Sequence, residues 1–129
     1  MRLVIMETGN HIDEVFKEGN WQQRRLERIQ KYIEDHLSAD LSAPVVAEKF
    51  DISPSTLQHS FKKQIQQTCQ QYVEEVRMNK AMEMIRQGKR IRAIMIATGY
   101  KNRSTFYGAF RRIFQHIPAT FKYGDENAP

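Results

Sequence analysis

The chain has 129 residues, enough for one or two small domains, and its 20 Lys and Arg outnumber its 15 Asp and Glu to give a net charge of +5. Cys69 is the only cysteine, so an intrachain disulfide and a cysteine metal cluster are excluded and a reducing cytoplasm is expected. No apolar run approaches transmembrane length, so no membrane partner is expected. The four histidines show no metal-ligand spacing, and the sequence therefore predicts neither a metal nor another cofactor.

Residues 1–20 form the first expected segment, which we interpret as a leader or as the remnant of an upstream domain. They carry two basic and four acidic residues, unlike the basic remainder of the chain. Gly9-Asn10 interrupts an apolar run, and Gly19-Asn20 is expected to end the segment before helical periodicity begins.

Residues 21–69 are predicted to form three helices. Ser42 suits the N-cap of the second helix, with Pro44 in its first turn. Asp51 tolerates the positive backbone angle of a tight turn, and Ser53 then suits the N-cap of the third helix. The first helix carries apolar residues three or four apart on one face: Leu26, Ile29, Ile33 and Leu37.

Residues 70–87 are predicted to form one longer linker helix that ends at Gly88, a residue type favoured just beyond helix ends. A second group of helices follows over 88–123, with a short helix, a turn at Gly99 and a further helix capped by Asn102. One face of that last helix carries aromatic residues four apart: Phe106, Phe110 and Phe114. No β-alternation of useful length follows residue 20, so the expected fold class is all-α.

The pattern of residues 42–65 recurs further along the chain. Asp51 and Gly99 are 48 residues apart, whereas Phe61 and Phe110 are 49 apart, so the second turn holds one extra residue. A basic pair lies at the end of each repeated helix: Lys62-Lys63 and Arg111-Arg112. This repeat is typical of a tandem helix-turn-helix. We therefore expect two three-helix helix-turn-helix modules (21–69 and 88–123), joined by the linker helix and followed by a tail (124–129).

The positive charge is concentrated late in the chain. Between Glu83 and Asp125 lie nine cations and no anion, a field that favours a polyanionic partner. The second helix of each helix-turn-helix can enter a major groove, where base edges present donors and acceptors. Double-stranded DNA is therefore the expected partner. A basic protein-interaction module, a non-specific nucleic-acid binder and a solvated face without a partner remain the alternatives.

The first exposed turns of the repeated helices carry the candidates for contacts with base edges: Ser55, Gln58, His59, Arg103, Ser104 and Tyr107. Gln58 suits a bidentate contact to adenine, and Arg103 suits either a guanine or a phosphate. The helix starts and the other cations supply the candidates for phosphate contacts: Ser53, Lys62, Lys63, Lys101, Asn102, Arg111 and Arg112. The aromatic residues are expected to face inward as core rather than to stack on bases.

Residues from about 24 to 122 resemble the DNA-binding domain of AraC/XylS-type transcription regulators. The resemblance rests on VVAEKFDISPSTLQHSFKK and QYVEEVRMNKAMEMI, and then on IATGYKNRSTFYGAFRRIF and IPATFK. It implies the family's seven helices, a monomer that contacts two successive major-groove segments, and no enzymatic activity. It also implies RNA polymerase at promoters as a partner and a cytoplasmic location in the bacterial nucleoid, with a dimer possible through a missing upstream domain.

Several positions depart from the family pattern. Gln66 and Gln115 stand where Gly usually follows each recognition helix, and Cys69 stands where Pro is frequent. Gly108 stands where some relatives carry a base-contacting Arg. The sequence preference of the second module is therefore not expected to follow that of those relatives.

Overall fold

The structure, a computed structural model, describes the backbone of residues 10–117 and the side chains of residues 21–117. Within these residues the chain forms six helices and no strand, which confirms the all-α prediction. The helices are α1 (Asn10–Asp35), α2 (Ala43–Lys49), α3 (Pro54–Ile65), α4 (Cys69–Arg86), α5 (Ile91–Thr98) and α6 (Arg103–Phe114). The end of the second predicted module and the tail 124–129 lie outside the described residues, so the family's seventh helix is not tested.

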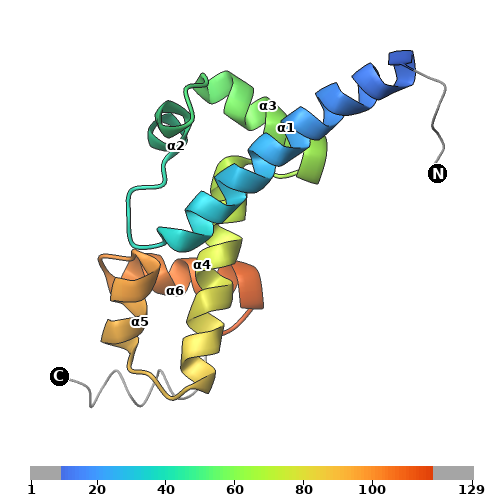
Figure 1. The fold of residues 1–129 in the computed structure, drawn as a ribbon. Helices are drawn as coiled ribbons and strands as arrows, with labels where there is room; N and C mark the ends of the chain where they lie inside the picture. The colour runs from blue at the N-terminus through green and yellow to red at the C-terminus, as the bar shows by residue number, and fades with distance from the viewer. Residues whose placement is uncertain (1–9, 118–129) are drawn as a thin grey trace.

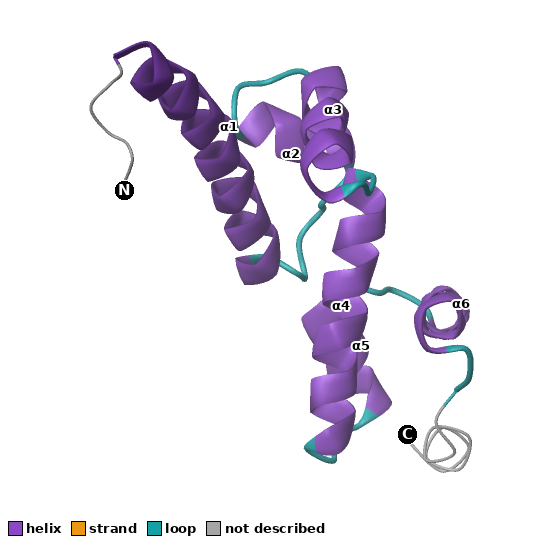
Figure 2. Ribbon diagram, turned by 90° about the vertical axis from the view of Figure 1, so that its right-hand side faces the viewer, coloured by secondary structure: helices purple, strands orange, loops and turns teal. Residues whose placement is uncertain are grey.

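The linker helix α4 connects two groups of helices (Figure 1). Its first half packs with α1, α2 and α3, and its second half packs with α5 and α6. The turned view shows the same arrangement, with α3 at one end of α4 and α5 alongside its other half (Figure 2). The predicted layout of two helix-turn-helix units on one connecting helix is confirmed.

Helix α1 starts earlier than the sequence predicted. It runs from Asn10 to Asp35 and passes through Gly19-Asn20, where an end of the N-terminal segment was expected, so that prediction is wrong. An internal Gly costs only about 1 kcal/mol of helix stability relative to Ala, too little to break a helix that continues on both sides. The N-terminal part of α1 extends beyond the other helices (Figure 1), whereas its second half buries Ile29 and Ile33 completely.

The described side chains form two separate apolar cores. The first core joins α1 to the start of α4 and includes Leu57 and Phe61 of α3, both fully buried. The second core joins the later turns of α4 to α5 and α6 and is dominated by aromatic rings: Phe106 and Phe110 are fully buried, and Phe114 packs at the edge. Because α4 serves both cores with different faces, its apolar pattern follows no single stripe. Met78, for example, is fully buried.

The two turns repeat each other in backbone geometry. Asp51 has a φ of 59° and Gly99 a φ of 83°, as predicted for tight turns between helices. The N–H of Ile52 donates to the Ala47 carbonyl at 3.1 Å, and the N–H of Tyr100 donates to the Met95 carbonyl at 3.0 Å. Both bonds join residues related by the same 48-residue offset. The turns therefore confirm the tandem repeat.

The two recognition helices, α3 and α6, also end alike. Gln66 has a φ of 57° and Gln115 a φ of 72°, so each lies in the left-handed region. Their N–H groups donate to the carbonyls of Lys62 and Arg111, at 3.1 Å and 2.9 Å. This geometry favours glycine, because a side chain raises the energy of a left-handed residue. The family's usual Gly at these positions is thereby explained, and both glutamines carry strain.

Replacing Gln115 by Gly is expected to raise the free energy of unfolding by about 0.5–1 kcal/mol, because relief of left-handed strain exceeds the entropy that glycine adds to the unfolded chain. Gln66→Gly is the matched control. The Gln66 side-chain amide donates to the Lys63 carbonyl at 3.3 Å. Replacing Gln66 by Gly also removes this hydrogen bond, so the gain in the free energy of unfolding should be smaller. Urea unfolding of the parent protein and the two variants measures both changes in the free energy of unfolding. A Gln115→Gly variant less stable than the parent would show that Gln115 is not strained.

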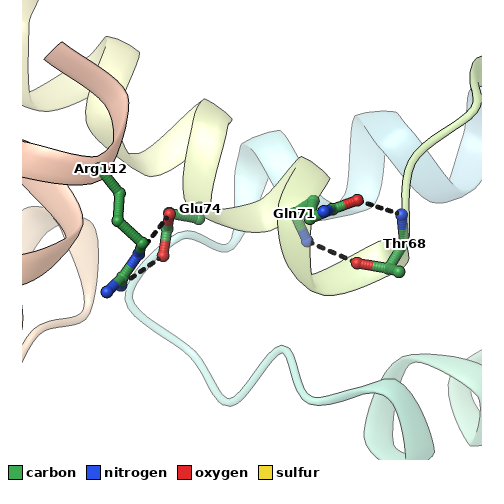
Figure 3. A network of polar contacts seen from close by, with 4 residues as sticks. All are labelled: Thr68, Gln71, Glu74 and Arg112. Carbon is green, nitrogen blue, oxygen red and sulfur yellow. Dashed lines mark hydrogen bonds and ion pairs between the residues drawn. The ribbon is translucent and has the colours of Figure 1, made fainter. Parts of the chain in front are cut away.

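Helix α4 begins with a capping box that the sequence analysis missed. The Thr68 hydroxyl accepts the N–H of Gln71 at 3.0 Å, and the Gln71 side chain accepts the N–H of Thr68 at 2.8 Å (Figure 3). These reciprocal bonds satisfy two donors that a helix start leaves open. They place the first residue of the linker helix at Cys69, one position before the predicted start.

Candidate nucleic-acid interface

Both recognition helices start with a side-chain cap. The Ser53 hydroxyl accepts the N–H of Thr56 at 3.0 Å, and the Asn102 carbonyl oxygen accepts the N–H of Thr105 at 2.8 Å. The predicted caps are confirmed. Since these side-chain oxygens are engaged in capping, the groups left at each helix start for a phosphate are backbone N–H donors of the first turn.

Helix α3 separates a buried face from a polar face. Leu57 and Phe61 are buried, whereas Ser55, His59 and Lys62 are exposed, as is Lys63. Exposed polar side chains therefore lie in the first turns of α3 and exposed cations in its last turn. This order along the helix is the one that the sequence predicted. A helix of this kind suits a major groove, which accommodates one helix and presents hydrogen-bonding groups on its floor.

Gln58 lies differently from its exposed neighbours. It is half-buried, and its carbonyl oxygen accepts the N–H of Cys69 at 3.0 Å. A bidentate contact to adenine needs both the oxygen and the NH₂ group of the amide, and here the oxygen already serves the start of α4. The NH₂ group is the part of Gln58 that remains for a base. The thiol of Cys69 is buried, which raises its pKa to about 11 and opposes thiolate reactivity.

Helix α6 exposes Arg103, Ser104 and Arg111. Tyr107, by contrast, is half-buried, with its ring 5.9 Å from that of Phe106 and its hydroxyl oxygen buried. The ring belongs to the second core, so a contact of this hydroxyl with a base edge does not fit the observed conformation. Tyr107 is the counterpart of Gln58 in the repeat, and both positions turn partly inward.

Gly108 is the counterpart of His59 in the repeat. A Cβ built on Gly108 would meet only the guanidinium of Arg112, at 3.8 Å, which is ordinary van der Waals contact. Close packing therefore does not explain the glycine. As a result α6 has no side chain where α3 exposes an imidazole, so the two helices differ in chemistry at this position.

The basic pairs at the ends of the recognition helices are also unlike. Arg112 donates to both carboxylate oxygens of Glu74 on α4, from Nε at 3.1 Å and from Nη2 at 2.8 Å (Figure 3). These hydrogen bonds raise the pKa of Arg112. Its counterpart Lys63 is exposed at the end of α3. Arg112 thus joins α6 to α4. The sequence analysis predicted a phosphate contact for Arg112 and did not predict this ion pair.

Lys101 lies where the two modules meet. It is exposed and borders an open cavity of about 460 Å³, together with Asp40. The N–H of Ser42 donates to the Asp40 carboxylate at 2.9 Å, and this bond, together with the positive charges of Arg77 and Lys101, lowers the pKa of Asp40. Lys101 is therefore placed both beside the start of α6 and close to an anionic side chain.

Two capped helices with polar outer faces, carried by a single connecting helix, define a tandem helix-turn-helix DNA-binding domain. No helix within residues 10–117 is long and apolar enough to cross a membrane.

Known proteins share this design. A family model described as a helix-turn-helix domain matches residues 46–123. The transcriptional activator RhaS of Escherichia coli O139:H28 is 30% identical over 101 residues, which cover 78% of this chain and 36% of RhaS. RhaS of Klebsiella pneumoniae is 27% identical over 96% of this chain and 44% of its own length. The C-terminal domain of AraT, a response regulator from Geobacillus stearothermophilus, superposes with a TM-score of 0.70 at 27% identity, over 77% of this chain and 84% of that one.

The chain belongs to the AraC/XylS-type family of helix-turn-helix DNA-binding domains. Members of this family are DNA-binding transcription regulators and not enzymes. The chain spans less than half the length of the curated relatives that it matches.

Proposed function

We propose that this chain binds double-stranded DNA as a monomer, with α3 and α6 in two successive major-groove segments on one face of the duplex. The observation that carries this proposal is that one connecting helix, α4, packs against both capped recognition helices, α3 and α6. The 18 residues of α4 span about 27 Å at 1.5 Å per residue. This length approaches the roughly 34 Å that separates major-groove segments one helical turn apart.

Base contacts are proposed for the exposed polar side chains of the first turns. In α3 these are Ser55, His59 and the NH₂ group of Gln58, and in α6 they are Arg103 and Ser104. Tyr107 is left out because its hydroxyl is buried. Phosphate contacts are proposed for the first-turn N–H groups of both helices and for four exposed cations: Lys62, Lys63, Lys101 and Arg111.

We further propose that the protein regulates transcription at bacterial promoters, in the nucleoid, with RNA polymerase as a partner. The similarity to RhaS, named as a transcriptional activator, supports this role. Two recognition helices on one chain make a dimer unnecessary for binding. A dimer formed through an upstream domain of a longer protein is compatible with the same DNA contacts.

Replacing Lys62 by Ala is expected to weaken binding to all duplexes alike, because a phosphate contact carries no sequence information. The slope of log affinity against log salt should fall in magnitude by about 0.9, the contribution of one neutralised phosphate. Titrations of a labelled duplex at several salt concentrations measure the slope. Arg112→Ala is the control: since Glu74 already binds this guanidinium, its slope should change less. Equal slope changes for the two variants would contradict the assignment.

Replacing Gln58 by Glu separates its two proposed roles. A carboxylate still accepts the Cys69 N–H, but it has no NH₂ group to donate to a base. We expect the free energy of unfolding to stay within about 0.5 kcal/mol of the parent value, while the preference at one base pair falls by about 1–3 kcal/mol. Affinities for duplexes that differ at single positions measure the preference. A variant that weakens every duplex equally would remove Gln58 from the base-contacting set.

A further inference from the structure

One side chain of the linker helix bonds to the loop that follows α1. Arg77, near the middle of α4, donates from Nε to the Leu37 carbonyl at 3.2 Å and from Nη2 to the Ala39 carbonyl at 2.9 Å. Both carbonyls belong to the connection between α1 and α2, within the first module. Two donors of one planar guanidinium fix its orientation more tightly than a single bond would.

The same guanidinium also faces the second module. Its central carbon lies 5.6 Å from the centre of the Tyr100 ring, in the range of cation–π contacts. Tyr100 follows the turn after α5 and packs edge-on against Phe106 of the second core, with ring centres 5.5 Å apart. Arg77 therefore contacts both modules at once.

The contacts of Arg77 with the α1–α2 connection and with Tyr100 form a junction between the modules. The backbone of the turn at Gly99 also packs against this junction. A Cβ on Gly99 would lie 2.5 Å from the Leu37 carbonyl oxygen and 3.0 Å from Nη2 of Arg77. The turn of the second module thus lies directly against the carbonyl that Arg77 binds in the first module. Only a glycine permits this close approach.

No apolar core fixes one module against the other within the described part of the chain, because the two clusters are separate. The orientation of α6 relative to α3 then depends on the stiffness of α4, on the Arg112–Glu74 ion pair and on the junction at Arg77. The ion pair links α6 to α4 alone, and its side chains are 63% exposed at Arg112 and 26% exposed at Glu74. Arg77 is half-buried and makes directional bonds.

We propose that Arg77 is a positioning residue that sets the spacing and rotational phase of the two recognition helices, and thereby the number of base pairs between the two sequences that they contact. This inference rests on the proposed binding of two major-groove segments. One extra base pair displaces the second sequence by about 3.4 Å and rotates it by about 35°. A rigid junction discriminates against such a displacement, whereas a loosened junction tolerates it.

The first test needs no DNA. Spin labels at Glu48→Cys of α2 and Ala93→Cys of α5, both exposed positions, report the distance between the modules in a Cys69→Ala background. Arg77→Met should broaden the distance distribution measured by double electron–electron resonance. Arg77→Lys keeps the charge but lacks the two-pronged donor, and it should give an intermediate width. Circular dichroism identifies any variant that has lost its helices. Distributions as narrow as that of the parent protein in folded variants would overturn the proposal.

The second test uses duplexes that carry both contacted sequences at the preferred spacing, or with one base pair inserted or deleted between them. The parent protein should prefer the original spacing by about tenfold, the size of one mismatched base pair. Arg77→Met should reduce this ratio to about threefold or less and leave affinity for either sequence alone unchanged. An unchanged ratio overturns the role of Arg77 but leaves two-segment binding intact. A parent protein without any spacing preference overturns both.

Discussion

Replacing Gly99 by Ala is expected to lower the free energy of unfolding by about 3 kcal/mol. Two costs add at this position. The backbone angle φ is 83°, and an L-residue in this region costs about 1–2 kcal/mol. The new Cβ would also lie 2.5 Å from the Leu37 carbonyl oxygen, a backbone atom that cannot move without shifting the connection between α1 and α2.

Gly88→Ala is the matched control for this prediction. Gly88 has a similar φ of 78°, but a Cβ there would meet no atom within 4 Å. Its replacement should therefore cost only the backbone contribution, about 1 kcal/mol. Urea unfolding followed by circular dichroism measures both values. Equal losses for the two alanine variants would show that the close approach between the modules does not exist in solution.

Replacing Phe106 by Ala is expected to cost about 3–5 kcal/mol, the usual range for an aromatic ring lost from a core. The side chain is fully buried, and its ring contacts those of Tyr100, Tyr107 and Phe110. Since the second core is separate from the first, the damage should be concentrated in α5 and α6. The variant should lose its preference for the DNA sequence that α6 contacts. It should keep its preference for the DNA sequence that α3 contacts.

Phe61→Ala is the reciprocal variant. Phe61 is fully buried in the first core and stands at the position that corresponds to Phe110 in the repeat. Its loss should remove the preference carried by α3 and spare that of α6. Hydrogen exchange of each variant locates the loosened helices, and affinities for duplexes with one sequence scrambled measure the two preferences. Equal loss of both preferences in either variant would contradict two independently packed modules.

Caps and turns were predictable from the sequence because each depends on residues close together in the chain. Ser53, Asn102, Asp51 and Gly99 all take the conformations that their residue types favour. The capping box at the start of α4 carried an equally local signal, Thr68 followed three residues later by Gln71. That pattern was available in the sequence and was overlooked.

The partners of the interface residues were not predictable, because they depend on how distant segments pack. Gln58 bonds to Cys69, eleven residues away, and Arg112 pairs with Glu74, 38 residues away. Helical periodicity shows which residues face away from the core. It does not show which other residues they contact. The sequence held one weak indication that Arg77 is partly buried. Arg77 is a cation between Val76, which packs against the first core, and Met78, which belongs to the second core.

Selection of bound duplexes from a random library at near-physiological salt, followed by sequencing, tests the central claim most directly. Fixed salt holds the phosphate contribution constant, so enrichment reports sequence preference. We expect two short enriched blocks about one helical turn apart and without palindromic symmetry. A single block would mean that only one helix contacts bases and that the other grips the backbone. Absence of any enrichment over the input library would contradict sequence-specific binding and favour a basic surface that docks proteins or nucleic acids without sequence preference.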